Sequence, residues 1–346
     1  MSEEIEFEDR IGLSFEDFKI TTMTAYFPNK SGSIKLSPLF YLIHWADVEL
    51  KLPLNHRSKK IKIIDDVPKG AITSIRYKSE TRGLERIVRK DSKSHFQNAI
   101  SMDVGTGNKS VCLKLSNKSI HIVGAKSVEM CKIASDIIMK EVKRINTFMK
   151  NYEKYRKDID LFLKAVKGEK RKMQKTVGKF TVIFEDYLIN DTSSKFEKIN
   201  KEVVDFFFPL LKEYIHYQQF ERLIQSLDKE RFICSEDFAM EEEPEIGMIN
   251  YNYNLPFQVN RKAIDQLMQD RYGFHTRFDN TQDSAVYVEL PYESNKKKKG
   301  KNTHTFMVRK SGSVTQTGPN IELMHEAFLL FVMALSEIKD EIISET

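Results

Sequence analysis

The side chains best suited to do chemistry in this chain stand at alternate positions around residue 310. A three-residue loop, Lys310-Ser311-Gly312, with Gly312 in the left-handed conformation, predicts a bulged hairpin. Because strand side chains alternate, one face of that hairpin would carry a thioether, a guanidinium and several hydroxyls: Met307, Arg309, Ser311, Ser313, Thr315 and Thr317. Such a face favours hydrogen bonding along a groove over bond cleavage in a cleft.

The other face of this hairpin is predicted to be apolar. It would carry Phe306, Val308 and Val314, which should pack against the helix expected after Gly318. An antiparallel sheet with helices on one side can leave its second face open to solvent. The hairpin therefore predicts one covered face and one open face.

No constellation typical of catalysis stands out in the sequence. The eight histidines are scattered, and Asp65-Asp66 is more typical of a turn than of a paired acid. Metal-ligand spacing, a glycine-rich phosphate loop and the setting of a nucleophile are all missing from the sequence. We therefore expect neither an enzyme nor a cofactor, and nucleic-acid repair chemistry is the weakest hypothesis.

Composition bounds the remaining classes. The 346 residues are 40% hydrophobic and 30% charged, with a formal net charge of +5, which only weakly indicates a polyanionic partner. Acidic residues gather at 2–9 and 241–245, whereas basic residues gather at 57–62, 76–93, 167–175 and 296–301. The three cysteines show no paired spacing and favour buried thiols. Without a signal peptide or a long apolar run, the sequence predicts an intracellular protein.

The elements that position these side chains form a unit that occurs twice. A hairpin followed by a long helix covers 111–142 and again 305–338, and Gly124 aligns with Gly318 without a gap. Each copy is preceded by a strand and a short helix, for which Ser37 and Asn260 are the expected N-caps. Further strands are expected within 71–77, 95–104, 274–278 and 285–292.

The first hairpin allows two registers. Alignment with the second copy predicts an open face with Leu113, Leu115, Asn117, Ser119, His121 and Val123. A two-residue loop at Asn117-Lys118 would instead gather Leu113 and Leu115 with Ile120 and Ile122 on a core face. We prefer the first register because it keeps the two copies equivalent.

The remaining segments have no counterpart in the repeat. Residues 1–18 are predicted to form a loose acidic arm. The stretch 143–235 has apolar residues at three- and four-residue spacing and predicts an inserted helical module, with its aromatic residues in a core. The expected division is therefore an arm at 1–18, one repeat at 19–142, a helical insertion at 143–235 and a second repeat at 240–346.

These features together resemble the TATA-box-binding protein family. The run Ser311-Gly312-Ser313-Val314-Thr315-Gln316-Thr317-Gly318 matches that family's hairpin pattern, and Val123-Gly124-Ala125-Lys126-Ser127 resembles its first copy. The resemblance implies an α+β fold: a pseudo-twofold saddle whose curved antiparallel sheet has helices on its convex side. The helical insertion departs from the family and is typical of a divergent member, such as those of large DNA viruses.

The resemblance also implies a function. In the family the concave sheet face enters the DNA minor groove and apolar wedges kink the duplex. It places Leu115 and Arg309 at the wedge positions of the hairpins, with partner wedges near Phe96 and Phe278. The asparagines that the family carries in the first strand of each repeat would fall near Thr22 and Gly247.

Two functional hypotheses follow from these observations. The first is a non-catalytic transcription initiation factor that binds AT-rich promoter DNA and recruits a transcription factor IIB-like protein and RNA polymerase. It would act in the nucleus or, for a viral protein, in a cytoplasmic viral factory or the virion. The alternative is a protein-interaction platform that uses the saddle and the helical insertion, with little or no DNA binding. It is favoured by the polar Arg309 at a wedge position and by the modest net charge.

Overall fold

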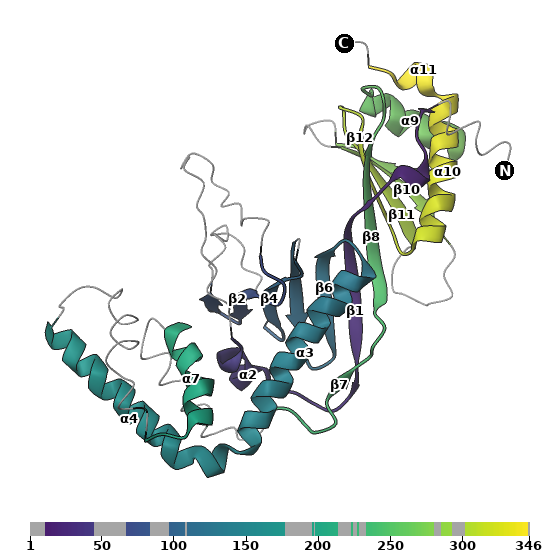
Figure 1. The fold of residues 1–346 in the computed structure, drawn as a ribbon. Coiled ribbons are helices and arrows are strands. Elements are labelled where there is room, and N and C mark those ends of the chain that lie inside the picture. The colour runs from purple at the N-terminus through teal and green to yellow at the C-terminus, as the bar shows by residue number, and fades with distance from the viewer. Residues whose placement is uncertain are drawn as a thin grey trace. The chain divides into compact units, whose positions relative to one another are not determined.

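The computed structural model describes most of the chain as a mixed α/β protein with antiparallel strands (Figure 1). The described residues are 11–44, 67–83, 97–107, 109–176, 196, 198–213, 223, 227, 233–279, 285–292 and 302–344. They fall into two compact units: unit 1 comprises 1–26, 122–131 and 244–346, and unit 2 comprises 27–121 and 132–243. Among the described helices, none is long and apolar enough to cross a membrane.

Unit 1 is built around an antiparallel sheet in the order β1-β8-β12-β11-β10-β9. Its strands are β1 (Ile20–Ser31, of which 20–26 belong to unit 1), β8 (Glu245–Asn254), β9 (His275–Arg277), β10 (Val286–Pro291), β11 (Thr303–Val308) and β12 (Ser313–Gly318). Its helices are the 3-10 turn η1 (Phe15–Asp17), α9 (Arg261–Tyr272), α10 (Ile321–Glu337) and α11 (Lys339–Ile342). The predicted N-cap of α9 is confirmed, since the Asn260 side chain accepts hydrogen bonds from two backbone amides.

One face of the unit 1 sheet is covered by helices (Figure 1). The ring of Phe306 on β11 stacks on that of Phe331 on α10, with centroids 4.1 Å apart, and Gln316 donates to the Met324 carbonyl. Helix α9 lies on the same side of the sheet, because Thr276 on β9 is buried and donates to the Asp265 carbonyl. The opposite face of the sheet is left to the alternate side chains of the same strands.

The expectation of a loose N-terminal arm is wrong for residues 11–18. Phe18 stacks on Tyr253 with ring centroids 4.4 Å apart, and Phe15 stacks on His325 at 4.9 Å. Ile11 and Phe15 are buried. The acidic residues of the N-terminal segment favour a loose arm, but its apolar residues bury enough surface to hold 11–18 in place within unit 1.

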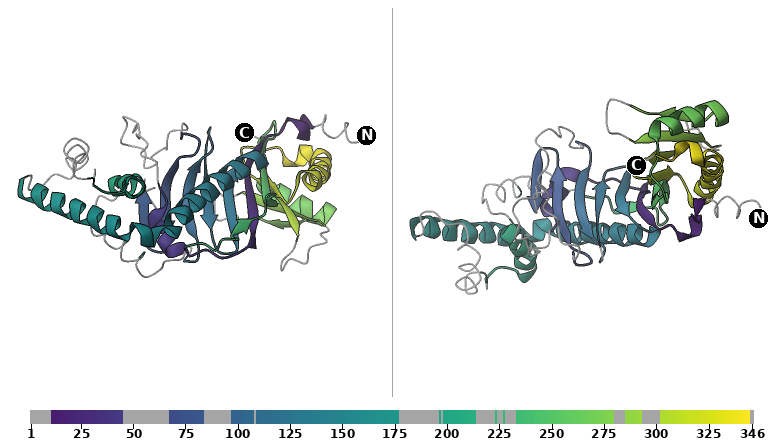
Figure 2. Two further views of the ribbon diagram at one scale, coloured as in Figure 1. Left: turned by 60° about the horizontal axis from the view of Figure 1, so that its bottom comes forward. Right: turned by 90° about the horizontal axis from the view of Figure 1, so that it is seen from above.

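Unit 2 contains a sheet in the order β3-β2-β4-β5-β6. Its strands are β2 (Ile72–Tyr77), β3 (Glu80–Gly83), β4 (Ile100–Gly105), β5 (Ser110–Leu115), the first part of β6 (Ser119–Ala125) and the short β7 (Ala239–Met240), which pairs with the end of β1. Its helices are α2 (Leu36–Leu42), most of α3 (Val128–Lys150), α4 (Tyr152–Thr176) and α7 (Lys201–Glu213). Helix α3 runs along one face of these strands (Figure 2).

Helix α2 begins earlier than the sequence predicts. Its N-cap is Lys35, without a capping side chain, so the expected cap at Ser37 is wrong. The helix is held instead by tertiary contacts, since the buried Arg82 guanidinium on β3 donates to the carbonyls of Phe40 and Ile43. Tertiary hydrogen bonds of this kind are invisible to a local capping rule.

The described part of the predicted helical insertion packs through aromatic rings, as expected. The rings of Phe148 on α3 and Phe206 on α7 stack with centroids 3.7 Å apart, and Phe207 meets both. Phe162 on α4 is fully buried. These helices cluster with the strands of unit 2, whereas the division of the chain into an arm, two repeats and an insertion stays a prediction.

The second hairpin has the predicted register. Met307 pairs with Thr315 and Thr305 with Thr317, while the Arg309 amide donates to the Ser313 carbonyl at 2.9 Å. Gly312 has φ +83°, and a Cβ there would overlap the Phe257 carbonyl oxygen, so glycine is required on both grounds. Phe306, Val308 and Val314 are fully buried, which confirms the covered face.

The preferred register of the first hairpin is wrong, and the two-residue loop is correct. The Ser116 amide donates to the Ser119 carbonyl at 3.0 Å, which leaves only Asn117 and Lys118 in the loop. Leu113 and Leu115 are therefore on the covered face and fully buried. The Ser116 hydroxyl closes the turn by accepting from the amides of Lys118 and Ser119.

Candidate functional site

The open face of the unit 1 sheet gathers the polar side chains predicted for the second hairpin. Ser313, Thr315 and Thr317 alternate with buried residues along β12 and are partly exposed. Met307 lies beside Thr315 on β11, and Ser311 is exposed in the loop. The structure thus brings together all six positions expected from the sequence here, with Arg309 as the sixth.

Strand β8 adds three asparagines that the sequence reasoning missed. Asn250, Asn252 and Asn254 pair respectively with Thr317, Thr315 and Ser313, and each pair puts an amide beside a hydroxyl. The residues that precede them in the sequence are buried on the face covered by helices: Ile249, Tyr251 and Tyr253. The strict alternation in Ile-Asn-Tyr-Asn-Tyr-Asn (249–254) is a period-two signal that could have placed them on the open face.

Strand β1 adds a hydroxyl, that of Thr22, beside the asparagine row of β8. Thr22 pairs with Asn250 of β8, which lies three residues beyond Gly247, the position suggested by the family resemblance. The Oδ1 atom of Asn250 is buried and has no hydrogen-bond partner among the described residues. Gly247 instead makes room for the Tyr26 ring, which would overlap a Cβ at that position and is itself 37% exposed.

Arg309 lies across this open face and does not project from it as a wedge. One guanidinium nitrogen is 3.4 Å from the Thr315 hydroxyl and another is 3.8 Å from the Met307 sulfur. The side chain is exposed. A cation held along a row of amides and hydroxyls can pair with a phosphate or enter a negative groove, but it supplies no apolar wedge.

The outer strands of the same face carry an ion-pair cluster. Glu289 on β10 lies 2.6 Å from the Arg277 guanidinium and 3.1 Å from Nδ1 of His275. Arg277 also stands over the Tyr287 ring, 5.4 Å from its centroid. The carboxylate is neutralised by its neighbours, so the edge of this face carries no free negative charge in the described residues.

The open face of the unit 2 sheet is more basic. Arg76 on β2 pairs with Ser101 on β4, which pairs in turn with Lys114 on β5. Burial lowers the pKa of His121 on β6, and the Lys114 ammonium lowers it further. Arg76 reaches the buried Asp103 carboxylate at 3.6 Å. Each of these side chains lies on the side away from Leu113 and Leu115.

The predicted residues of the first hairpin divide between three places. Ser119, His121 and Val123 alternate on β6 as partly exposed residues, as expected. Asn117 is exposed in the loop, where its carbonyl accepts from the Asn29 side chain at 2.8 Å. Leu113 and Leu115 lie in the core, so a wedge role for Leu115 is excluded by its burial.

The two phenylalanines proposed as partner wedges cannot both be placed. Phe96, like Asp65-Asp66, lies outside the described residues. Phe278 follows β9 and is partly exposed, with the Arg261 guanidinium 5.4 Å from its ring centroid. Among the described residues, no group of three or more His, Cys, Asp and Glu side chains is arranged to hold a metal ion.

Comparison with known proteins finds similarity in structure. No family model and no curated protein matches the chain. Among solved structures, the TBP of Methanococcus jannaschii is similar over 92% of this chain and 98% of its own, with 10% identity and a TM-score of 0.39. At this level the likeness assigns no activity, and the sheet faces have to carry any functional proposal.

Proposed function

We propose that this chain is a non-catalytic DNA-binding factor that engages the minor groove of AT-rich promoter DNA with the open sheet faces. The observation that carries the proposal is the pairing of Asn250, Asn252 and Asn254 with Thr317, Thr315 and Ser313 on the uncovered face of unit 1. The sequence resemblance of 311–318 to the TATA-box-binding family supports it independently.

The chemistry of this row suits the minor groove. An A·T pair presents only acceptors there, N3 of adenine and O2 of thymine, whereas a G·C pair adds the N2 amino donor of guanine. Asparagine amides and threonine hydroxyls can donate to the A·T acceptors without carrying a charge. The row would therefore donate to A·T pairs, whereas at a G·C pair the projecting guanine amino group would occupy the space of such a contact.

The remaining affinity would come from phosphate contacts. Arg309 in unit 1, and Arg76 and Lys114 in unit 2, are cations on open faces. Cations that neutralise phosphates release counterions, so binding should weaken steeply with salt. Because Leu115 is buried, intercalation by this residue plays no part in the proposal, and strong kinking is not expected from the first hairpin.

In this proposal the protein recruits other proteins and performs no reaction. A transcription factor IIB-like protein and RNA polymerase are the proposed partners, and the nucleus or a viral factory is the proposed location. Both follow from the sequence resemblance, and neither is needed for the DNA-binding test.

The test is a binding titration with two duplexes of equal length, one AT-rich and one GC-rich, at several salt concentrations. We expect tighter binding to the AT-rich duplex and a linear fall of log K with log salt. Asn252→Ala should reduce the AT preference, since a single lost base contact costs about 1–3 kcal/mol. The matched control is Lys262→Ala on the exposed surface of α9.

Absence of salt-sensitive binding to both duplexes, with the fold intact by circular dichroism, would reject the proposal. In that case a protein-interaction platform becomes the better reading. Two observations favour this second candidate: the buried Leu115 and the ion-paired Glu289 on the unit 1 face. It would be tested by partner capture with and without residues 146–232, with DNA absent.

A further inference from the structure

Helix α3 presents a row of lysines along one side. At 100° per residue, Lys132, Lys143 and Lys150 fall within about 20° of one another around the helix axis. Lys140 lies beside this row, and Lys140, Lys143 and Lys150 are exposed. These residues belong to unit 2 and lie on the helix that covers the apolar face of its sheet.

An acidic segment of the chain, residues 233–243, runs beside this row. Its position is set by backbone hydrogen bonds: the Ser235 amide donates to the Ser33 carbonyl at 2.9 Å, and the Glu241 amide donates to the Pro28 carbonyl at 2.9 Å. The Lys35 amide donates to the Ile233 carbonyl at 2.7 Å. The segment is therefore a fixed wall facing α3.

Carboxylates of this segment already pair with the lysines at both ends of the row. Lys132 lies 2.6 Å from Glu243, and Lys150 lies 2.9 Å from Glu236. Lys143 stands between them, about 16 Å along the helix from Lys132 and about 10 Å from Lys150. Neither Lys143 nor its neighbour Lys140 forms an ion pair within the described residues.

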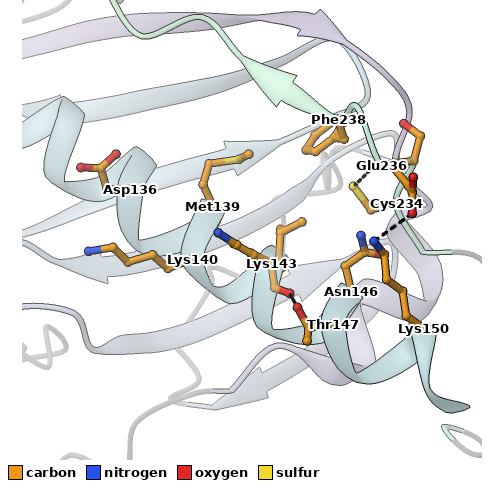
Figure 3. Close-up of a pocket in the computed structure, with 12 residues that line it drawn as sticks. Asp136, Met139, Lys140, Lys143, Asn146, Thr147, Lys150, Cys234, Glu236 and Phe238 are labelled. Carbon is orange, nitrogen blue, oxygen red and sulfur yellow. Dashed lines mark hydrogen bonds and ion pairs between the residues drawn. The ribbon is translucent and has the colours of Figure 1, made fainter.

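A groove of about 420 Å³ lies between α3 and this wall, next to the two lysines (Figure 3). Val142 and Cys234 form a buried apolar floor, and the partly exposed Met139 and Phe238 form its sides. Asn146 and Thr147 add polar groups between Lys143 and Lys150. The groove thus combines an apolar floor with the ammonium groups of Lys140 and Lys143, which form no ion pair in the part of the chain that the structure describes.

We propose that this groove binds an acidic peptide segment of a partner protein. A partner carboxylate would pair with Lys143, as Glu236 and Glu243 pair with the flanking lysines, and an apolar side chain would lie between Met139 and Phe238. Nucleic acid fits less well, because its backbone offers phosphates but no apolar side chain for the floor formed by Val142 and Cys234. Since α3 lies on the opposite face of the unit 2 sheet, a peptide in this groove would not cover Lys114 or His121.

The test uses the full chain and a fluorescein-labelled synthetic peptide rich in glutamate with one central phenylalanine. Fluorescence anisotropy should show salt-sensitive binding, and Lys143→Glu should weaken it on the order of tenfold, since like charges in an interface are strongly unfavourable. Lys157→Glu, a matched change at an exposed lysine of α4, should leave binding unchanged. Replacing the peptide's phenylalanine by serine should weaken binding several-fold.

Charge reversal separates recognition from a structural effect. A peptide with lysines in place of the glutamates should bind the Lys143→Glu protein more tightly than it binds the wild type. The proposal is overturned if the folded wild type binds no acidic peptide, or if Lys157→Glu weakens binding as much as Lys143→Glu. It is also overturned if a single-stranded oligonucleotide displaces the peptide and if Lys143→Glu weakens oligonucleotide binding as much as it weakens peptide binding. None of these outcomes depends on duplex DNA binding.

Discussion

The two hairpins differ by one residue in their loops, and that residue decides which side chains face solvent. The β11–β12 hairpin turns through Lys310, Ser311 and Gly312, whereas the β5–β6 hairpin turns through Asn117 and Lys118 alone. The outgoing strands β6 and β12 keep equivalent faces. The incoming strands do not, because a shift of one residue exchanges the two faces of a strand.

On the incoming strands β5 and β11, equivalent positions are therefore shifted by one residue from the gapless alignment. The positions that match Met307 and Arg309 are Lys114 and Ser116, and the gapless alignment had pointed to Leu113 and Leu115. The open face of the first hairpin is consequently polar and basic at a position where the second carries a thioether. The two open faces are thus chemically different.

The largest expected effect tests the register of the first hairpin. Leu115→Ala should lower the free energy of unfolding by about 3 kcal/mol, because it opens a cavity in the core. Met307→Ala, at an open position of the second hairpin, should change it by less than about 0.5 kcal/mol. Urea denaturation of both variants measures the difference. Equal losses would contradict the assignment of faces.

The second hairpin was predictable because its loop contains the decisive residue. A glycine at position 312 indicates a left-handed backbone conformation there, and that conformation fixes the register of both strands. The first loop contains no glycine, and its turn depends on the Ser116 hydroxyl, which local sequence patterns signal weakly. The gapless alignment of the two copies predicts the wrong register for the first hairpin, because it assumes loops of equal length.

Physical reasons also decide which other parts of the site the sequence predicts. The alternation of apolar and polar residues at 249–254 is sufficient to predict that the three asparagines share one face of the strand. The sequence does not predict the α3 groove, because its wall, residues 233–243, is brought beside the helix only by tertiary hydrogen bonds. The docking of Phe15 and Phe18 was hidden in the same way.

A second prediction compares histidines on the two faces. Burial lowers the pKa of His304, on the covered face of β11, from 6.5 to about 4. Between these values the unfolded chain binds the proton and the folded chain does not, so stability falls as the pH drops from about 6.5 toward 4. We expect a loss of about 2 kcal/mol from this group, at 1.36 kcal/mol per pKa unit with allowance for relaxation.

The measurement is the free energy of unfolding as a function of pH for the wild type, His304→Gln and His121→Gln. The wild-type slope between pH 6.5 and 4 should flatten in His304→Gln. It should flatten less in His121→Gln, because His121 lies on the open face and is only partly buried. The reverse order would place the two histidines on the wrong faces.

A third prediction contrasts the ways in which the two loops turn. Gly312→Ala should cost about 1–3 kcal/mol, because φ is +83° and the added Cβ would overlap the Phe257 carbonyl oxygen. Ser116→Ala should cost about 1 kcal/mol through its lost hydrogen bonds to the turn. Thermal unfolding of both variants ranks them. A larger loss at Ser116 would show that the first turn is the more constrained.

The smallest effect sharpens the chemical difference between the open faces. Lys114→Ala and Arg309→Ala should each reduce the slope of log K against log salt by about one, as expected for a lost phosphate contact. Asn252→Ala, a neutral residue beside Thr315, should alter the preference for AT-rich DNA and leave the slope unchanged. Titrations at four or more salt concentrations separate the two behaviours. A change of slope in Asn252→Ala would mean that the asparagine row positions the backbone and does not read bases, and the two faces would then share one role.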